Sequence, residues 1–193
     1  MLRSLYDRTM RLAGHRHALA MLGLVSFVES SVFPIPPDVL LVPMVLADRL
    51  RAWRIALVCT AASVAGGLAG YAIGALLFET VGRPLIAFYG YADAFASFQS
   101  WYNEWGLWIV FTAGLTPLPY KVFTIASGVT GLSLVPFVVG SLASRGLRFY
   151  IEAALLRHYG PPIRAFVEGH LGQVTVAFVV LLVGGFAVAR WLA

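Results

Sequence analysis

Two short proline turns of nearly the same sequence interrupt the apolar stretches of this chain. The first is Phe-Pro-Ile-Pro-Pro-Asp at residues 33–38 and the second is Thr-Pro-Leu-Pro-Tyr-Lys at residues 116–121. Corresponding positions of the two turns lie 83 residues apart: Pro34 and Pro117, Pro36 and Pro119, and Asp38 and Lys121. Proline ends a helix, and inside a membrane a non-helical backbone is tolerated only where protein or water satisfies it. Two matched breaks in the two halves of a chain indicate a transport site formed by an internal repeat.

The composition predicts an integral membrane protein. The chain has 193 residues, of which 60% are hydrophobic and 12% charged, and its mean hydropathy is +0.82. A soluble domain is usually about 45–50% apolar and about 25% charged. The net charge of +5 comes from basic residues beside the apolar stretches, as the positive-inside rule describes, so we expect no nucleic-acid partner. Cys59 is the single cysteine and therefore forms no internal disulfide.

The first 47 residues predict a surface helix followed by a re-entrant hairpin. Residues 1–17 carry four arginines and suit an amphipathic helix on the cytoplasmic surface, which we expect to be retained rather than cleaved. Residues 18–33 and 39–47 are apolar arms, each too short to span a bilayer, on either side of Pro34, Pro36 and Pro37. Basic residues precede and follow the hairpin at about 18–47, which places both flanks on the cytoplasmic side.

The middle of the chain predicts one spanning helix and one interfacial segment. Residues 55–78 are long and apolar enough to cross, and Gly66, Gly70 and Gly74 recur every fourth residue on one face. Such a face permits close helix packing, against the chain's own helices or against a second copy in a homodimer. Residues 79–105 are acidic and rich in aromatics, which favours an external interfacial stretch over the alternative, a membrane-spanning role for residues 84–98.

The second half repeats the hairpin from the opposite side of the membrane. A hairpin at about 106–130 surrounds Pro117 and Pro119, and an inverted topology follows because a single crossing separates it from the first. Residues 133–156 predict a second span, 157–164 a polar cytoplasmic loop, and 174–192 a last span. We therefore predict an all-α polytopic protein with two inverted-repeat re-entrant hairpins and three to four transmembrane helices. A membrane domain at 18–160 is then followed by a loop and a C-terminal helix at 161–193.

Two acidic residues are candidates for proton binding. Glu29 lies within an apolar arm, where a carboxylate costs on the order of 3 kcal/mol at mid-membrane and is usually functional. Burial favours its neutral form and lets it take up and release a proton. Asp38 follows the first turn as Lys121 follows the second. The two either neutralise each other where the turns meet, or each stabilises its own turn or reaches water.

Arg145, Arg148 and Glu152 are spaced to share one helix face. With Lys121, the two guanidinium groups make a plausible site for a lipid phosphate, because the arginine fork matches phosphate oxygens. In the alternative interpretation, the span shifts to residues 122–143 and both arginines are flanking cytoplasmic charges. The sequence contains no common hydrolase, zinc-protease or phosphate-loop motif and no histidine cluster. We therefore expect neither an enzyme nor a metal or cofactor.

Three motifs give this chain a resemblance to a known family: Glu-Ser-Ser-Val-Phe-Pro-Ile-Pro-Pro-Asp at 29–38, Gly-Tyr-Ala-Ile-Gly at 70–74, and Thr-Pro-Leu-Pro-Tyr-Lys-Val-Phe-Thr-Ile-Ala-Ser-Gly at 116–128. Over about residues 20–160 the chain resembles the DedA family, the bacterial branch of the VTT or SNARE-associated Golgi protein superfamily, and its YqaA-type members most. The resemblance implies two opposed re-entrant hairpins in the bacterial cytoplasmic (inner) membrane. It also implies movement of phospholipid or undecaprenyl phosphate between leaflets, coupled to protons or sodium.

The resemblance assigns the membrane-embedded acid of the family to Glu29 and a second acid to Asp38 or Asp48. Many members carry one arginine before the second turn, where this chain has Gly114 and Leu115, and another just after it, where Lys121 is the only basic residue. Arg145 or Arg148 is a candidate substitute. The resulting hypothesis is a flippase-like or scramblase-like lipid transporter. The alternatives are a small ion or proton antiporter, and a non-transporting scaffold that recruits partners through its basic N-terminus.

Overall fold

The computed structural model describes residues 17–33, 36–116 and 118–169, and this part of the chain is helical without strands. Two helical stretches are long and apolar enough to cross a membrane: Arg49–Tyr89, with a mean hydropathy of 1.7, and Leu134–Gly160, with 1.2. Shorter apolar helices accompany them at Ala18–Ser31 and Asp38–Ala47. The predicted all-α membrane fold is confirmed. The predicted segment 1–17, apart from His17, and the span 174–192 lie outside the described residues.

The first half of the fold is a broken helix pair followed by a long helix. α2 (Ala18–Ser31) ends at the first proline turn, and α3 (Asp38–Ala47) begins after Pro37. The carboxylate of Asp38 thus lies at a helix N-terminus, where negative charge is favoured. One 3₁₀ turn, η1 (Arg49–Arg51), leads into α4 (Ala52–Leu77), and Asp48 caps that turn by accepting a hydrogen bond from the Leu50 N–H.

The second half repeats this order after a helical connection. A π-helical turn, η2 (Phe78–Gly82), continues α4 into α5 (Arg83–Tyr89), which ends at Gly90 with a φ of 70°. α6 (Ala92–Leu115), the second proline turn, α7 (Tyr120–Val129) and α8 (Leu134–Gly169) follow.

Two segments differ from the sequence-based expectation. Residues 79–105, predicted as an interfacial stretch, are largely helical, so the first arm of the second hairpin begins at residue 92 rather than 106. Residues 92–105 contain no proline or glycine, and nothing interrupts the helix there. The polar loop predicted at 157–164 is also helical, because α8 continues to residue 169. Its two prolines remove N–H donors without ending the helix.

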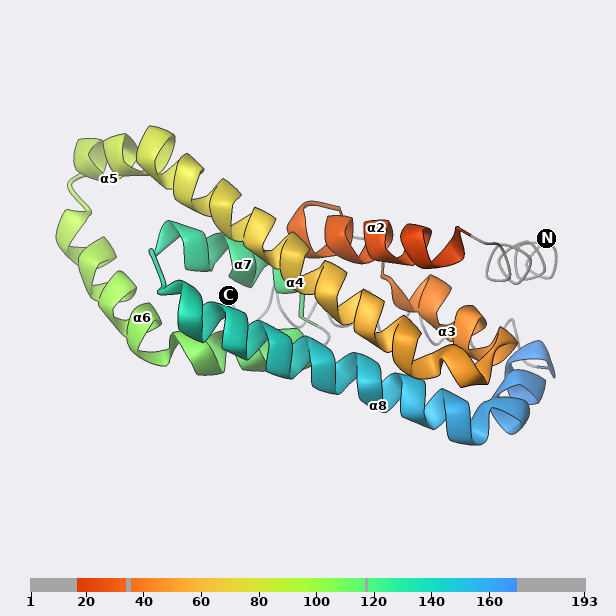
Figure 1. The fold of residues 1–193 in the computed structure, drawn as a ribbon. Helices are drawn as coiled ribbons and strands as arrows, with labels where there is room; N and C mark the ends of the chain where they lie inside the picture. The colour runs from red at the N-terminus through yellow and green to blue at the C-terminus, as the bar shows by residue number, and fades with distance from the viewer. Residues whose placement is uncertain (1–16, 34–35, 117, 170–193) are drawn as a thin grey trace.

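The internal repeat extends beyond the proline turns to the helices themselves. α7 begins at residue 120 and α3 at residue 38, and α8 begins at 134 and α4 at 52, so both pairs are separated by 82 residues. α2 packs along α4, and α6 packs along α8, while α3 packs on α8 and α7 on α4 (Figure 1). The second arm of each hairpin therefore contacts the long helix of the other half, which interlocks the two repeats.

The glycine face of α4 packs against the chain's own short helices. A side chain at Gly66 would collide with the Phe27 carbonyl of α2, and one at Gly74 with the Ile125 carbonyl of α7. Gly70 lies against the Thr124 side chain. The chain's own helices therefore occupy this face.

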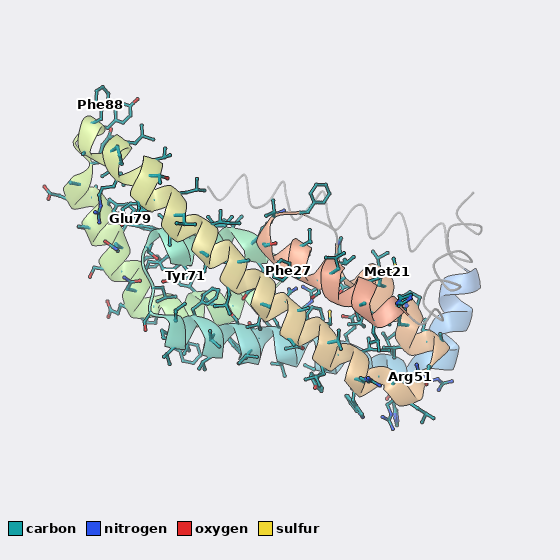
Figure 2. All side chains as sticks on the ribbon, turned by 45° about the horizontal axis from the view of Figure 1, so that its top comes forward. Met21, Phe27, Arg51, Tyr71, Glu79 and Phe88 are labelled. Atoms are coloured by element: carbon teal, nitrogen blue, oxygen red, sulfur yellow. The ribbon has the colours of Figure 1, made fainter. Side chains whose placement is uncertain are left out.

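The two ends of the long helix carry different side chains. Figure 2 shows Arg51 at one end of the long helical stretch 49–89, and Glu79 and Phe88 toward the other end. Arg51 pairs with Asp48, and Glu79 with Arg83, both as exposed ion pairs. The basic and the aromatic side chains thus lie at opposite ends of this helical stretch.

Candidate functional site

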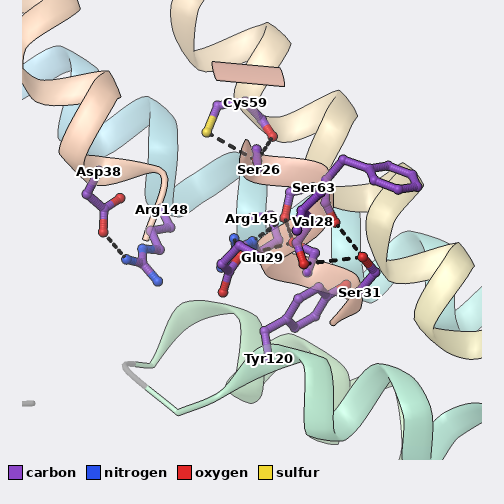
Figure 3. A network of polar contacts seen from close by, with 12 residues as sticks. Ser26, Val28, Glu29, Ser31, Asp38, Cys59, Ser63, Tyr120, Arg145 and Arg148 are labelled. Carbon is purple, nitrogen blue, oxygen red and sulfur yellow. Dashed lines mark hydrogen bonds and ion pairs between the residues drawn. The ribbon is translucent and has the colours of Figure 1, made fainter. Parts of the chain in front are cut away.

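A buried polar cluster lies where the end of α2, the middle of α4 and the middle of α8 meet near the two proline turns (Figure 3). It sits between two apolar cores. One core is formed by α2, α3, α4 and α8, and the other is formed mainly by α6, α7 and the start of α8. In this cluster the two halves of the chain form polar contacts with each other.

Arg145 is the centre of this cluster, and it is only 1% exposed. Its Nη2 donates to Glu29 Oε2 at 2.8 Å, and its Nε donates to Ser63 Oγ at 2.6 Å. The guanidinium also lies 5.0 Å from the ring centroid of Tyr120 and 4.7 Å from that of Phe149, one ring from each apolar core. Ion pairing and cation–π contacts together compensate a charge that arginine cannot lose by deprotonation.

Two serines close a hydrogen-bonded ring around the ion pair. Ser30 Oγ donates to Glu29 Oε2 at 3.1 Å and lies 2.7 Å from Ser63 Oγ. Because the single proton of Ser30 goes to Glu29, the Ser63 hydroxyl donates to Ser30 while it accepts from Arg145. The ring ties α2, α4 and α8 together, and each contact in it supports the next.

A second ion pair lies beside the first. Arg148 Nη2 contacts Asp38 Oδ2 at 2.7 Å, and the two side chains are 30% and 24% exposed. Arg148 is thus more accessible than Arg145. Glu152 lies one turn further along α8, four residues after Arg148.

The structure does not pair Asp38 with Lys121. Asp38 takes Arg148 as its partner, and Lys121 Nζ instead donates to the Val32 carbonyl in the first turn at 3.4 Å. Thr124 Oγ1 makes a parallel contact with the Ser30 carbonyl at 3.3 Å. The segment after the second turn therefore does reach the first turn, but through backbone carbonyls rather than through opposite charges. The predicted turn residues Pro34 and Pro117 lie outside the described residues.

Sequence reasoning selected the charges of this site but not their partners. Glu29 and Arg145 come together, as do Asp38 and Arg148, while Lys121 lies at the edge. Ser63 and Ser30 were missed, because a serine in an apolar helix usually bonds to its own backbone and gives no signal by itself. For Glu152 the sequence indicates only a place on the same helix face as the two arginines.

In this arrangement, the Glu29 carboxylate occupies the Arg145 guanidinium as its anionic partner. Glu29 is 18% exposed at its side chain, and its carboxylate is the counter-ion of the buried Arg145 guanidinium. Protonation of Glu29 would leave the guanidinium without its anion. A second anion, such as a phosphate, could then take the place of the carboxylate.

Comparisons with known proteins relate this chain to a family. Residues 35–158 match the sequence pattern of the VTT domain. An uncharacterised protein of Haemophilus influenzae is 38% identical over 187 residues, which are 97% of this chain and 97% of the relative. An uncharacterised protein of Histophilus somni is 38% identical over 185 residues, 93% of this chain and 96% of the relative. No solved structure matches this chain.

Proposed function

The chain belongs to the VTT-domain family of membrane proteins, the DedA family, and we propose that it moves a phosphate-bearing lipid between membrane leaflets, driven by protons. The observation that carries the proposal is the Glu29–Arg145 pair, a buried carboxylate and guanidinium that join the two halves of an internal repeat. Charged residues in a membrane interior cost free energy and usually mark a transport pathway. Phospholipids and undecaprenyl phosphate share the phosphate that an arginine recognises.

In the proposed cycle, the lipid phosphate and the Glu29 carboxylate compete for Arg145. The phosphate first meets Lys121 and Arg148, which are more accessible than Arg145. A proton on Glu29 then frees Arg145 for the phosphate, and loss of this proton restores the ion pair and expels the phosphate. Competition for one guanidinium couples proton binding to lipid binding and proton loss to lipid release, while the acyl or prenyl chains stay in the bilayer.

The proposed topology follows from the broken helices. α2 and α3, and the end of α6 with α7, would form hairpins that enter from opposite faces of the bacterial cytoplasmic membrane. The two turns would then lie near its middle, where an irregular backbone is satisfied by protein or by a watery cavity. The basic end with Arg51, and with it the N-terminus, would face the cytoplasm.

The test is the accessibility of labelled lipid headgroups in proteoliposomes that contain the purified protein. We expect protein-dependent movement of labelled phospholipid or polyprenyl phosphate, which a proton gradient stimulates. Glu29→Gln should abolish the stimulation. The double variant Glu29→Gln/Arg145→Met keeps the interior free of an unpaired charge, so it should fold and yet move no lipid. Glu79→Gln, in an exposed ion pair, is the matched control and should retain activity.

Other outcomes would overturn the proposal. Absence of movement for both lipids, with and without a gradient, would favour ion transport or scaffolding. Loss of function on deletion of residues 2–17, with transport in liposomes never observed, would favour the scaffold. Full gradient-stimulated activity of Glu29→Gln would exclude Glu29 as the proton carrier.

A further inference from the structure

An open cavity of about 360 Å³ lies at the basic end of the two long helices. It is lined by Trp53 in the first turn of α4 and by Ala154, Leu155, Arg157, His158 and Tyr159 of α8. Trp53 precedes Ser63 of the buried cluster by ten residues, and Arg157 follows Arg145 by twelve. The cavity therefore lies about 15 Å or more from that cluster along both helices, and it is a separate feature of the molecule.

Arg157 lies in this cavity without a carboxylate partner. Its guanidinium carbon is 5.5 Å from the ring centroid of Trp53, which itself stacks on Tyr150 at 5.9 Å. In the described part of the chain, no carboxylate lies within ion-pairing distance of Arg157. Arg83, at the opposite end of the helices, also lies beside an aromatic ring but pairs with Glu79 at 3.2 Å. The aromatic stack at the cavity thus positions a cation that no described carboxylate neutralises.

A second guanidinium lies beside the cavity and comes from η1. A side chain at Gly160 would meet Arg49 Nε at 3.2 Å, so the glycine lets Arg49 lie against α8 directly after Tyr159. Arg49 also has no carboxylate partner among the described residues, and the adjacent Asp48 pairs with Arg51 instead. None of the described residues that line the cavity is acidic. Two cations from two elements therefore meet at one cavity, which favours an anionic ligand.

The position and the apolar part of the lining indicate which anion this is. The cavity lies at one end of both helices that can cross a membrane, where tryptophan and tyrosine commonly lie at the level of the lipid headgroups. Leu155 is 51% exposed and can contact acyl chains, whereas an arginine fork matches phosphate oxygens. A zwitterionic headgroup would bring its ammonium group next to Arg157 and Arg49, so a headgroup with a net negative charge fits better. Basic pockets between transmembrane helices are a general means of binding such headgroups.

We propose that this cavity binds the phosphate headgroup of one anionic phospholipid, in the leaflet at the basic end of the helices. Arg157 and Arg49 hold the phosphate. Trp53 and Tyr159 lie at the level of the headgroup, and an acyl chain follows Leu155 into the bilayer. The bound lipid bridges η1, α4 and α8. It is a resident lipid rather than a transported one, so the site does not depend on the proposed transport.

Native mass spectrometry of the purified full chain in detergent, with added phosphatidylglycerol or phosphatidylcholine of the same acyl chains, measures this binding. We expect phosphatidylglycerol to bind more tightly than phosphatidylcholine. Arg157→Gln should weaken the binding of phosphatidylglycerol about fivefold, which is the effect of one guanidinium near a membrane surface. Arg83→Gln is the matched control, because it removes the same charge from beside another aromatic ring, and it should bind the lipid as the parent protein does.

A second background separates this site from the proposed transport site. The double variant Glu29→Gln/Arg145→Met lacks the buried ion pair, and adding Arg157→Gln to it should again weaken phosphatidylglycerol binding about fivefold. No effect of Arg157→Gln in that background would overturn the proposal, because the lipid would then bind elsewhere.

Three other results would decide the matter. Equal binding of the two lipids, or equal losses in Arg157→Gln and Arg83→Gln, would overturn the proposal. Displacement of phosphatidylglycerol by an equal concentration of inorganic phosphate would also overturn it, since the cavity would then take a soluble anion. Binding that behaves as expected in a protein that moves no lipid would uphold the resident-lipid site and refute the transport proposal.

Discussion

Removal of the Glu29 charge by Glu29→Gln leaves Arg145 as an unpaired cation in the protein interior. Arg145 is 1% exposed and cannot deprotonate, so neither water nor titration can relieve the charge. Breaking a buried ion pair in this way costs about 3–5 kcal/mol. The reverse change, Arg145→Met, leaves Glu29, which is 18% exposed and can take up a proton. We expect Arg145→Met to lower the free energy of unfolding by about 1–3 kcal/mol, which is the cost of an unsatisfied buried group.

The double variant Glu29→Gln/Arg145→Met separates this reasoning from simple loss of contacts. It removes both charges and fills the space with a side chain of similar length, so no uncompensated ion remains. Replacement of a whole buried pair by apolar groups is often neutral or stabilising. We therefore expect the double variant to be more stable than Glu29→Gln alone by about 2 kcal/mol or more, although it carries one more substitution.

Equilibrium unfolding in mixed detergent micelles, followed by tryptophan fluorescence and circular dichroism, measures these differences. The matched control is Glu79→Gln/Arg83→Met, in an ion pair whose side chains are 58% and 68% exposed. Such a pair contributes at most about 1 kcal/mol, so the free energy of unfolding of the control should differ from that of the parent protein by no more than this amount. Additive losses at Glu29 and Arg145, or equal losses in the buried and exposed pairs, would refute the argument from burial.

Two further substitutions and one labelling experiment test the packing around this pair. Gly66→Ala places a methyl group against a carbonyl of α2 and should destabilise by about 1–3 kcal/mol in the same unfolding assay, whereas Gly23→Ala, with only ordinary contacts, should not. Ser63→Ala removes the acceptor of Arg145 Nε and should lower the free energy of unfolding by about 1–3 kcal/mol. A loss below about 0.5 kcal/mol would mean that the ring of hydrogen bonds does not stabilise the fold. Cys59 is fully buried, so a maleimide should label it only as fast as the protein unfolds, and rapid labelling of the folded protein would contradict the packing of α2 on α4.

The sequence predicted the breaks in this fold better than the lengths of its helices. Prolines remove donors whatever surrounds them, so both interruptions follow from local chemistry. The extent of α6 did not follow in this way. Its early aromatics, such as Trp101 and Trp105, are exposed in the structure and suit an interface, while Tyr102 between them is buried. Only the tertiary packing shows which of these rings the helix places inward.

The charges of the site were predictable, and their pairing was not. A carboxylate or guanidinium in an apolar stretch is conspicuous because its burial is costly. Which charges meet depends on how the helices cross. The sequence of α3 or of α8 alone does not predict that these two helices pack together. The matched positions of Asp38 and Lys121 in the two turns suggested that these residues pair with each other. In the structure, Asp38 pairs with Arg148 of α8 instead.

This crossing shows how a repeated backbone can carry a site that is not repeated. The two proline turns and the following helices recur at the same spacing, yet both arginines of the site lie in α8, and α4 supplies Ser63 to Arg145. In the first half, Glu29 and Asp38 provide the carboxylates that face these arginines. A rocking motion of one repeat against the other would therefore change both ion pairs at once. Protons that neutralise the carboxylates would ease that motion, which is the coupling that a proton-driven transporter requires.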